Sequence, residues 1–292
     1  NNKSGNKDYP EYPIFVSDKG SEVLYDKPHI HGGAYEGDKF KFVVDPFTID
    51  SLDNFIANNI RLKGTLISAI FPNIDKPLTV QKDYSLGFEV TTPASGLAAY
   101  KGKNTFNEKI SLNGLQGNGT IHYLSATAIG EAFVFLPDST IGETTSFVNK
   151  EQNSGLIVPQ VSASRTNMSF IPDQDIMKIA TIGEPISCFN GQSNMQGEFR
   201  LKPTGMEGKG DMGIADAIIK SGRFTYTDHD IYADTSDFSL SGVGDEFAFK
   251  TQDVSAHMDL QARKGEFKSN GEASFVEFPA NQYVCYMDKF IW

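Results

Sequence analysis

Apolar and polar positions alternate along most of the chain. The segments Phe40–Phe42, Phe133–Phe135 and Phe224–Tyr226 place an aromatic residue at every second position, which is the spacing of side chains on one face of a β-strand. Pairs that favour tight turns, such as Asn190-Gly191 and Asn270-Gly271, separate these segments. The pattern therefore predicts an all-β fold.

Helical periodicity is rare. Asp50 to Leu62 predicts one short helix, with Leu52, Phe55 and Ile56 on one face, and Asp175 to Ile182 is a weaker candidate. The 22 Phe, 11 Tyr and 27 Gly residues favour strands and tight turns over helices.

A repeat is visible in the glycines. Gly114–Gly119 and Gly205–Gly210 share the spacing G-x-x-G-x-G at an offset of 91 residues, and the same offset aligns Phe133 with Phe224. A repeating β-unit buries its apolar faces by stacking on its neighbours. We therefore expect an elongated stack of repeating β-layers, either a β-solenoid, a β-groove or tandem sandwiches, with a unit of about 90 residues.

The repeat suggests a division of the chain. We expect a polar leader over residues 1–30, a first β-repeat region over 31–145, a connecting segment over 146–198 and a second β-repeat region over 199–292. The last region ends on an apolar pattern, so we expect the repeats to continue beyond it or a partner to cover it.

Charge and composition exclude some partners. The net charge of −11 argues against nucleic acid, which needs a basic face. No run of 18 apolar residues occurs, so we expect no transmembrane segment. The two cysteines, Cys188 and Cys285, are too few for a disulfide scaffold; one bridge and two separate thiols both stay open.

The segment Thr227–Phe238 holds four aspartates and a histidine. Asp228-His229-Asp230 follows a strand pattern at a place where the repeat elsewhere has Pro or Asn, so we interpret it as a turn. Asp234 and Asp237 recur as an acidic step, which makes them candidates for a weak surface Ca²⁺ site. With Asp216 they are also candidates for the carboxylate pair of a glycoside hydrolase.

Two further groups are candidates for binding. His29 and His31 have the i, i+2 spacing that places both imidazoles on one face of a strand, as in the start of a metal site. Tyr283, Tyr286 and Trp292 are candidates for a face that binds a glycan or a protein partner, against the alternative of core packing. The chain has no G-x-S-x-G, H-E-x-x-H or P-loop motif, so no catalytic residue is predicted.

The repeat motifs resemble a known group of proteins. Gly114–Leu124, Phe133–Ser139, Leu62–Leu66 with Phe71-Pro72, and Asp83–Phe88 resemble motifs of very long uncharacterised cell-envelope proteins of Bacteroidetes. More loosely, the architecture resembles the β-grooves of lipopolysaccharide-transport and AsmA-type lipid-transport proteins. The resemblance implies an extracytoplasmic location, in the periplasm or at the cell surface and associated with the outer membrane.

These observations favour a non-catalytic structural or binding module of a large envelope protein. Its expected partners are neighbouring repeats or another envelope protein, with an apolar groove or edge offered to lipid or protein. A surface β-helix protein that binds or cleaves carbohydrate is the alternative, and an acidic adhesin stalk stiffened by Ca²⁺ is the third. No cofactor is expected besides a Ca²⁺ ion at the weak surface site.

Overall fold

The structure is a computed structural model, and it describes residues 15–19, 21–24, 40–49, 61–68, 74–75, 78–80, 86–91, 105–111, 114–136, 139–242, 244 and 246–292. The chain forms two compact units. The first contains residues 1–121 and 131–141, and the second contains residues 122–130 and 142–292. The candidate site lies in the second unit.

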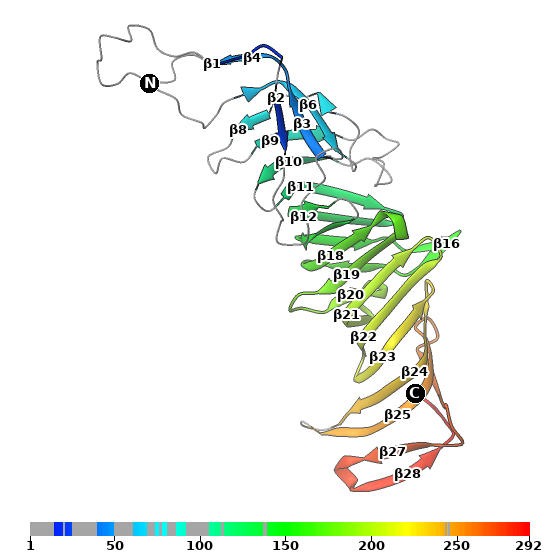
Figure 1. The fold of residues 1–292 in the computed structure, drawn as a ribbon. Coiled ribbons are helices and arrows are strands. Elements are labelled where there is room, and N and C mark those ends of the chain that lie inside the picture. The colour runs from blue at the N-terminus through cyan, green and yellow to red at the C-terminus, as the bar shows by residue number, and fades with distance from the viewer. Residues whose placement is uncertain are drawn as a thin grey trace, which may run out of the picture. The chain divides into compact units, whose positions relative to one another are not determined.

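The described part of the first unit consists of short strands (Figure 1). Its strands are β1 (Phe15–Ser17), β2 (Ser21–Leu24), β3 (Phe40–Val44), β4 (Phe47–Ile49), β5 (Arg61–Leu62), β6 (Gly64–Ser68), β7 (Ile74–Asp75), β8 (Leu78–Val80), β9 (Leu86–Thr91) and β10 (Thr105–Ser111). Strands β11 (Gly114–Tyr123), β12 (Ala126–Phe135) and β13 (Thr140–Thr144) contribute residues to both units.

The second unit is a longer antiparallel meander with three 3₁₀ turns. Its remaining elements are β14 (Ser146–Asn149), β15 (Gln152–Ser154), β16 (Leu156–Val158), β17 (Val161–Ala163), β18 (Thr166–Ile171), η2 (Pro172–Gln174), β19 (Ile176–Thr181), β20 (Ile186–Cys188), η3 (Phe189–Gly191), β21 (Ser193–Lys202), β22 (Gly205–Ile214), β23 (Ala217–Tyr226), β24 (Asp230–Ser241), β25 (Phe247–Asp259), β26 (Lys264–Ser269), β27 (Ser274–Phe278), η4 (Pro279–Asn281), β28 (Tyr283–Met287) and β29 (Lys289–Ile291).

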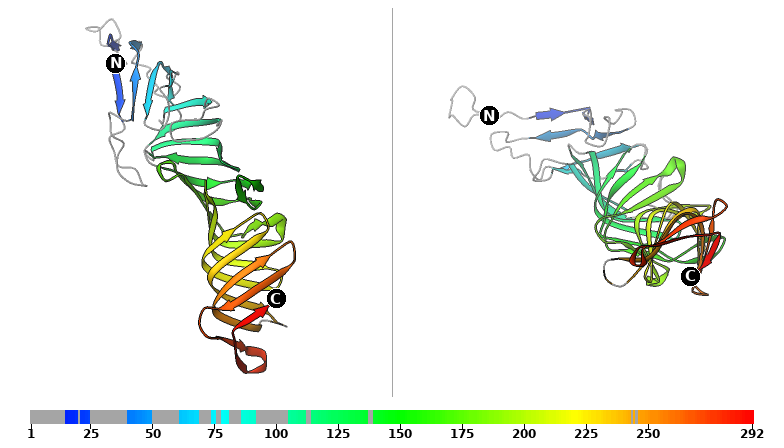
Figure 2. Two further views of the ribbon diagram at one scale, coloured as in Figure 1. Left: turned by 90° about the vertical axis from the view of Figure 1, so that its right-hand side faces the viewer. Right: turned by 90° about the horizontal axis from the view of Figure 1, so that it is seen from below.

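Strand pairing divides the second unit into two walls. The first wall runs through β14, β17 and β20, then through residues 193–195 of β21, and ends at β27 and β28. The second wall runs through β18 and β19, then through residues 198–201 of β21, and ends at β26 and β29. Between these ends, the long strands β21 to β25 each contribute one half to each wall, as the curved sheet in Figure 2 shows.

Eight strands close into a barrel. Their pairings form the ring β12, β14, β17, β20, β21, β19, β18 and β13. The ring arises because β13 and β14, β17 and β18, and β19 and β20 are consecutive halves of three chain segments, one half in each branch. The two branches meet at β21, whose two ends pair with β20 and β19.

Bulges let the long strands bend without turning their apolar face outward. In β23 the buried residues are Ala217, Ile219 and Ser221, and then Phe224 and Tyr226, so the alternation shifts by one position. The same shift occurs in β24, where pairing with β25 is irregular. An extra residue on one strand bends it and increases its local twist. The apolar side chains of both halves of each strand therefore face the interior.

Two glycines allow the closest approach at this bend. Gly197 and Gly210 lie opposite each other in β21 and β22. A Cβ on Gly197 would collide with the carbonyl oxygen of Lys209, and one on Gly210 with that of Gln196. Gly210 also has a φ of +137°, a value that residues with a side chain rarely adopt. We call the line of bends across β21 to β25 the crease.

Hydroxyl groups complete the hydrogen bonding at the crease. Pairing of β23 with β24 is interrupted between Lys220 and Thr225. There the Ser221 hydroxyl donates to the Thr235 carbonyl at 2.7 Å and accepts from the Arg223 N–H at 3.1 Å. Buried main-chain groups need such partners wherever a β-ladder opens.

Side chains from the two walls fill the space between them. Phe238 of the first wall is fully buried and lies 4.6 Å from Phe267 and 5.3 Å from Phe290 of the second wall, measured between ring centroids. At the other end of the crease, Phe189 lies 6.3 Å from Tyr226. Aromatic pairs at these distances stabilise a core beyond their buried area. The walls form one packed core over β21 to β29.

The all-β prediction is confirmed, and one helix prediction is wrong. Residues 176–181 form strand β19 instead of a helix, because Met177 and Ile179 are buried at a spacing of two and Asp175 ends the preceding 3₁₀ turn with a φ of +52°. Of the helix predicted from Asp50 to Leu62, residues 50–60 lie outside the described residues and Arg61–Leu62 form β5. Among the described residues, no helix has the length and apolar character needed to cross a membrane.

Candidate functional site

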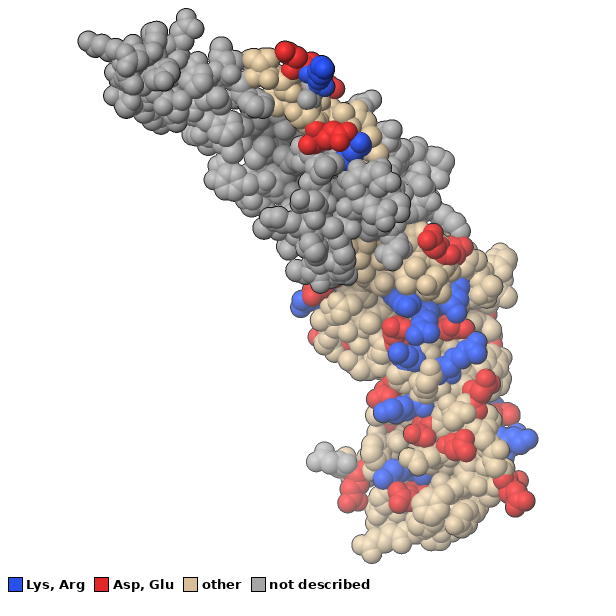
Figure 3. Space-filling view, viewed as in Figure 1, with Lys and Arg blue, Asp and Glu red and all other residues tan. Residues whose placement is uncertain are grey.

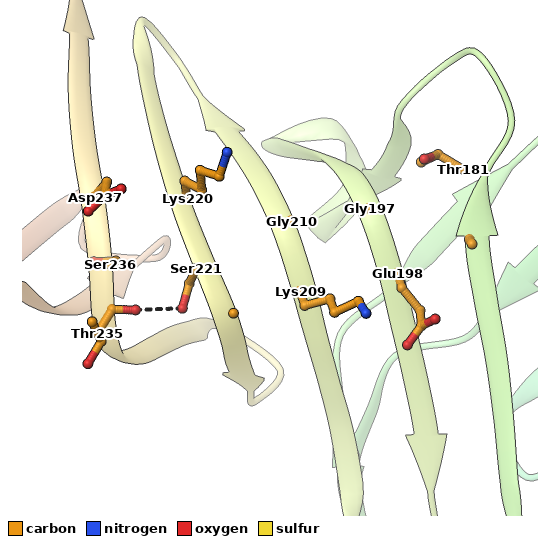
Figure 4. A pocket seen from close by; sticks show the side chains of 12 residues that line it. Thr181, Gly197, Glu198, Lys209, Gly210, Lys220, Ser221, Thr235, Ser236 and Asp237 are labelled. Atoms are coloured by element: carbon orange, nitrogen blue, oxygen red, sulfur yellow. Dashed lines mark hydrogen bonds between the residues drawn. The ribbon is translucent and has the colours of Figure 1, made fainter. Parts of the chain in front are cut away.

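The candidate site is a furrow on the outer surface of the second unit, beside the crease. It consists of two depressions of about 670 and 360 Å³ that share Lys220 and Asp237. The larger one crosses β19, β21, β22, β23 and β24, and its floor includes the glycines of the crease (Figure 4). The furrow exists here because residues without side chains interrupt an otherwise covered sheet surface.

Opposite charges alternate across the furrow. Glu198 lies opposite Lys209, and Lys220 lies between Asp211 and Asp237 in the strand register. The Lys220 Nζ is 3.9 Å from the Asp211 carboxylate. Figure 3 shows basic and acidic side chains interspersed over this part of the molecule. Cross-strand pairs of opposite charge stabilise a sheet modestly, and the mixture gives the furrow no strong preference for an anion or a cation.

The smaller depression ends on aromatic residues. Its lining combines Lys250 and Glu277, which form an ion pair of 3.2 Å, with the side chain of Phe275. Phe275 is 48% exposed and meets the ring of Tyr286, which is 72% exposed, edge to face at 5.8 Å. Exposed aromatic rings beside carboxylates and hydroxyls can stack on an uncharged polar ligand and hydrogen-bond to its edges.

The structure separates the two aspartates of the predicted calcium site. Asp237 lines both depressions of the furrow opposite Lys220, whereas Asp234 lies across the bulge, exposed, with its carbonyl accepting from the Asn270 amide at 3.0 Å. Among the described residues, no three His, Cys, Asp or Glu side chains come together as a metal site. The calcium site stays a prediction.

The three aromatic residues predicted as a binding face have different surroundings in the structure. Tyr283 and Tyr286 are three positions apart in β28 and so point to opposite faces of it. Tyr283, 56% exposed, lies against Phe278 on the interior side with ring centroids 5.5 Å apart, and Trp292 packs against Phe238 with ring centroids 5.9 Å apart. Only Tyr286 belongs to the outer surface beside the furrow.

The other residues singled out from the sequence lie at separate places in the chain. His29 and His31 lie outside the described residues. The Asp228-His229-Asp230 turn is confirmed, because Tyr226 pairs with Ile231 and the Thr227 N–H donates to the Asp230 carbonyl at 3.0 Å. Asp216 lies in the turn between β22 and β23 and is not among the residues that line the furrow.

One cluster was missed at the sequence level. The His257 Nε2 lies 2.8 Å from an Asp230 carboxylate oxygen, and the His257 ring stacks on Tyr232 at 4.5 Å. The Thr227 hydroxyl donates to the other Asp230 oxygen at 3.1 Å. The cluster stabilises a hairpin end on the surface. Only the pairing of β24 with β25 brings residues 230 and 257 together, and the bulges make that register unpredictable from spacing.

Both cysteines are free thiols. Cys188 is fully buried between the walls, and burial raises the pKa of its thiol to about 12. A thiol with so high a pKa is a poor nucleophile at neutral pH. Cys285 is half-buried on β28.

Comparison with known proteins adds no assignment. No protein-family model matches the chain, and no curated protein or solved structure matches it either.

Proposed function

We propose that this protein is a non-catalytic structural and binding module, in which the packed two-walled body is a rigid spacer and the outer furrow is a contact surface. The observation that carries the proposal is the filled interior: the aromatic residues of both walls meet between them, as Phe238, Phe267 and Phe290 do. A packed interior resists deformation because its side chains occupy fixed rotamers. Binding is then left to outer surfaces and edges.

The correspondence between strands supports a repeated design for this spacer. β11 and β22 both span ten residues at an offset of 91, and so do β12 and β23. The turns between them agree as well, with φ of +52° at Leu124 and +48° at Ala215. In this proposal the chain is a stack of β-layers with a unit of about 90 residues, and it belongs outside the cytoplasm as its sequence resemblance implies.

A spacer and a lipid carrier differ in what the interior holds. We expect native mass spectrometry of the protein, after incubation with vesicles of phosphatidylethanolamine and phosphatidylglycerol, to show the polypeptide without phospholipid. The variant Phe238→Ala removes a ring from between the walls and provides the matched control for space in the interior. The spacer role would be contradicted if the native chain bound phospholipid in stoichiometric amount and if Phe238→Ala changed the amount bound.

A second candidate function is carbohydrate binding in the smaller depression. Phe275 and Tyr286 offer exposed rings beside Asp237 and Glu277, which is the combination that sugar rings and their hydroxyls need. Affinity electrophoresis in gels that contain dextran, xylan or mannan tests it. We expect retardation of the native chain by one polysaccharide and its loss in Phe275→Ala, while Tyr283→Ala, on the opposite face, leaves it unchanged. Equal mobility in all gels would remove this candidate.

A further inference from the structure

The larger depression of the furrow is a trough that runs along the crease, across the strands. Gly197, Gly210 and Ser221 lie opposite one another in β21, β22 and β23 and form its floor. Thr181 of β19 and Ser236 of β24 continue the lining at the two ends. Neighbouring strands are about 4.8 Å apart, so a trough that crosses five strands is about 19 Å long. It can therefore hold an extended chain rather than a single small molecule.

One glycine of the trough has no role in the fold itself. Gly197 and Gly210 are needed because the two main chains approach closely there. Gly222 is exposed, does not have a positive φ, and has no atom within 4 Å of the position that a Cβ would take. A glycine in a strand weakens the strand and packs against nothing. The effect of Gly222 is that the trough stays open.

The sides of the trough alternate in charge from strand to strand. On the first-wall side, Lys220 of β23 lies between Asp211 and Asp237, which gives an acceptor, a donor and an acceptor on three successive strands. On the second-wall side, Glu198 lies opposite Lys209 (Figure 4). A charged ligand would meet a like charge wherever it met an opposite one. The trough therefore suits an uncharged ligand that both donates and accepts hydrogen bonds.

A linear sugar chain has these properties. Each hydroxyl of a sugar donates and accepts. In a β-1,4-linked chain the length of one sugar is close to the spacing of neighbouring strands, and each sugar is turned by half a rotation from the one before it. The same edge of the chain consequently meets one side of the trough at every second strand, which is also the period of the acceptors on the first-wall side.

An extended peptide suits the trough less well. Its main-chain N–H and C=O groups need partners. The trough lies on the face of a sheet, where the strands β21 and β22 already pair with each other along their whole length. The main chain of the floor thus offers few free groups to a peptide that crosses it.

We propose that the trough binds a linear, uncharged, β-1,4-linked polysaccharide, which lies along the crease with about one sugar for each strand that it crosses. The floor without side chains lets the sugars approach the sheet, and the alternating lysines and carboxylates hydrogen-bond to their hydroxyls. The inference rests on the proposed role of the furrow as a contact surface. It does not depend on carbohydrate binding in the smaller depression.

The test is isothermal titration calorimetry of the full chain with β-1,4-linked hexaoses of glucose, mannose and xylose. We expect saturable binding of at least one of them, at least tenfold weaker binding of the trisaccharide of the same sugar, and no saturable binding of the α-1,4-linked glucose hexaose. Gly222→Trp fills the trough and should weaken binding at least tenfold. Ala262→Trp, in the exposed turn between β25 and β26, is the matched control and should bind within twofold of the native chain.

NMR of the native chain locates the sugar without relying on a variant. We expect the hexaose to shift the amide signals of Gly197, Gly210 and Gly222 more than those of residues 264–269 in β26. Larger shifts in β26 would overturn the proposal. The absence of binding by all three β-1,4-linked hexaoses would overturn it as well, and so would equal binding of hexaose and trisaccharide.

The variants separate this inference from the carbohydrate candidate of the smaller depression. Binding that Phe275→Ala abolishes and Gly222→Trp leaves unchanged would support that candidate and overturn the trough. Binding that only Gly222→Trp abolishes would support the trough alone. A dimer of the native chain, detected by light scattering and abolished by Gly222→Trp, would overturn the proposal in favour of a second copy as the occupant.

Discussion

β21 and the β28–β29 edge are built alike but differ in exposure. Each is a bent strand that divides between the two walls. Among the described residues, β21 has neighbours on both sides, whereas the edge formed by β28 and β29 has a neighbour on one. Met195 is fully buried in β21, whereas Tyr283 is 56% exposed. Burial in this fold is thus decided by the presence of the next strand as much as by the residue type, because a single strand cannot cover its own apolar face.

The largest expected difference lies between a core ring and an edge ring. Phe238→Ala should lower the free energy of unfolding by about 4 kcal/mol, because it removes a fully buried ring that packs against three aromatic rings of the second wall. Tyr286→Ala should lower it by less than about 1 kcal/mol, since Tyr286 is 72% exposed. Urea unfolding followed by tryptophan fluorescence and circular dichroism measures both. Similar losses would mean that the edge is covered in solution.

The crease glycines should be the next most sensitive positions. Gly210→Ala should cost about 3 kcal/mol, because the new Cβ meets the main chain of β21 at a φ of +137°. Gly222→Ala is the matched control: no atom lies within 4 Å of its Cβ position, so the effect should stay within about 0.5 kcal/mol. Thermal unfolding of both variants compares them. A tolerated Gly210→Ala would show that the bend does not require close strand approach.

One buried hydroxyl should be dispensable. The Tyr226 hydroxyl is buried without a hydrogen-bond partner among the described residues, and burial raises its pKa well above the usual value. Tyr226→Phe should therefore stabilise the protein by about 1 kcal/mol. Phe135 holds the corresponding place in β12, 91 residues earlier.

Tyr123→Phe is the control, since the Tyr123 hydroxyl donates to the Asp175 carbonyl at 2.5 Å and its loss should destabilise by about 1 kcal/mol. Differential scanning calorimetry compares the two variants. Destabilisation by Tyr226→Phe would indicate a partner for the Tyr226 hydroxyl.

The smallest expected effect concerns the edge. Hydrogen bonds from Lys264 and then Lys289 lower the pKa of Glu266 to about 2, and Lys289 belongs to β29. Because the folded pKa is below that of the unfolded chain, about 4.3, this pairing stabilises the fold above pH 4.3 and is lost as the pH falls toward 2. Lys289→Met should raise the Glu266 pKa and flatten the pH dependence of stability between pH 5 and 2, within the window set by the lowered pKa.

Titration of Glu266 by NMR, with Lys250→Met as a control for the loss of one positive charge, measures this change. Lys250 pairs with Glu277 in the other wall. An unchanged Glu266 pKa in Lys289→Met would mean that Lys264 alone lowers the pKa of this carboxylate.

The sequence predicted local features well and tertiary contacts poorly. Period-2 alternation identified strands such as β23, and the Asp228–Asp230 turn followed from turn chemistry. The furrow was not predictable, because it depends on which residues lie opposite one another. Lys220 faces Asp237 only through a register that bulges interrupt.

The placement of the predicted aromatic face was not predictable for a related reason. Tyr283 and Tyr286 are close in sequence, but strand geometry places them on opposite faces of β28. The β19 segment was misjudged because its apolar residues suit both periodicities over a short run, and the hairpin with β18 decided between them.

The pairing of each bent strand with the segments next to it along the chain also sets how the protein can fold. From β21 to β25, every strand pairs with the one that precedes it, joined by a short connection. Closing short loops costs little entropy, and folds rich in local contacts form quickly. A nascent chain can therefore add one strand at a time to a structured end as it emerges from the ribosome, without waiting for distant segments.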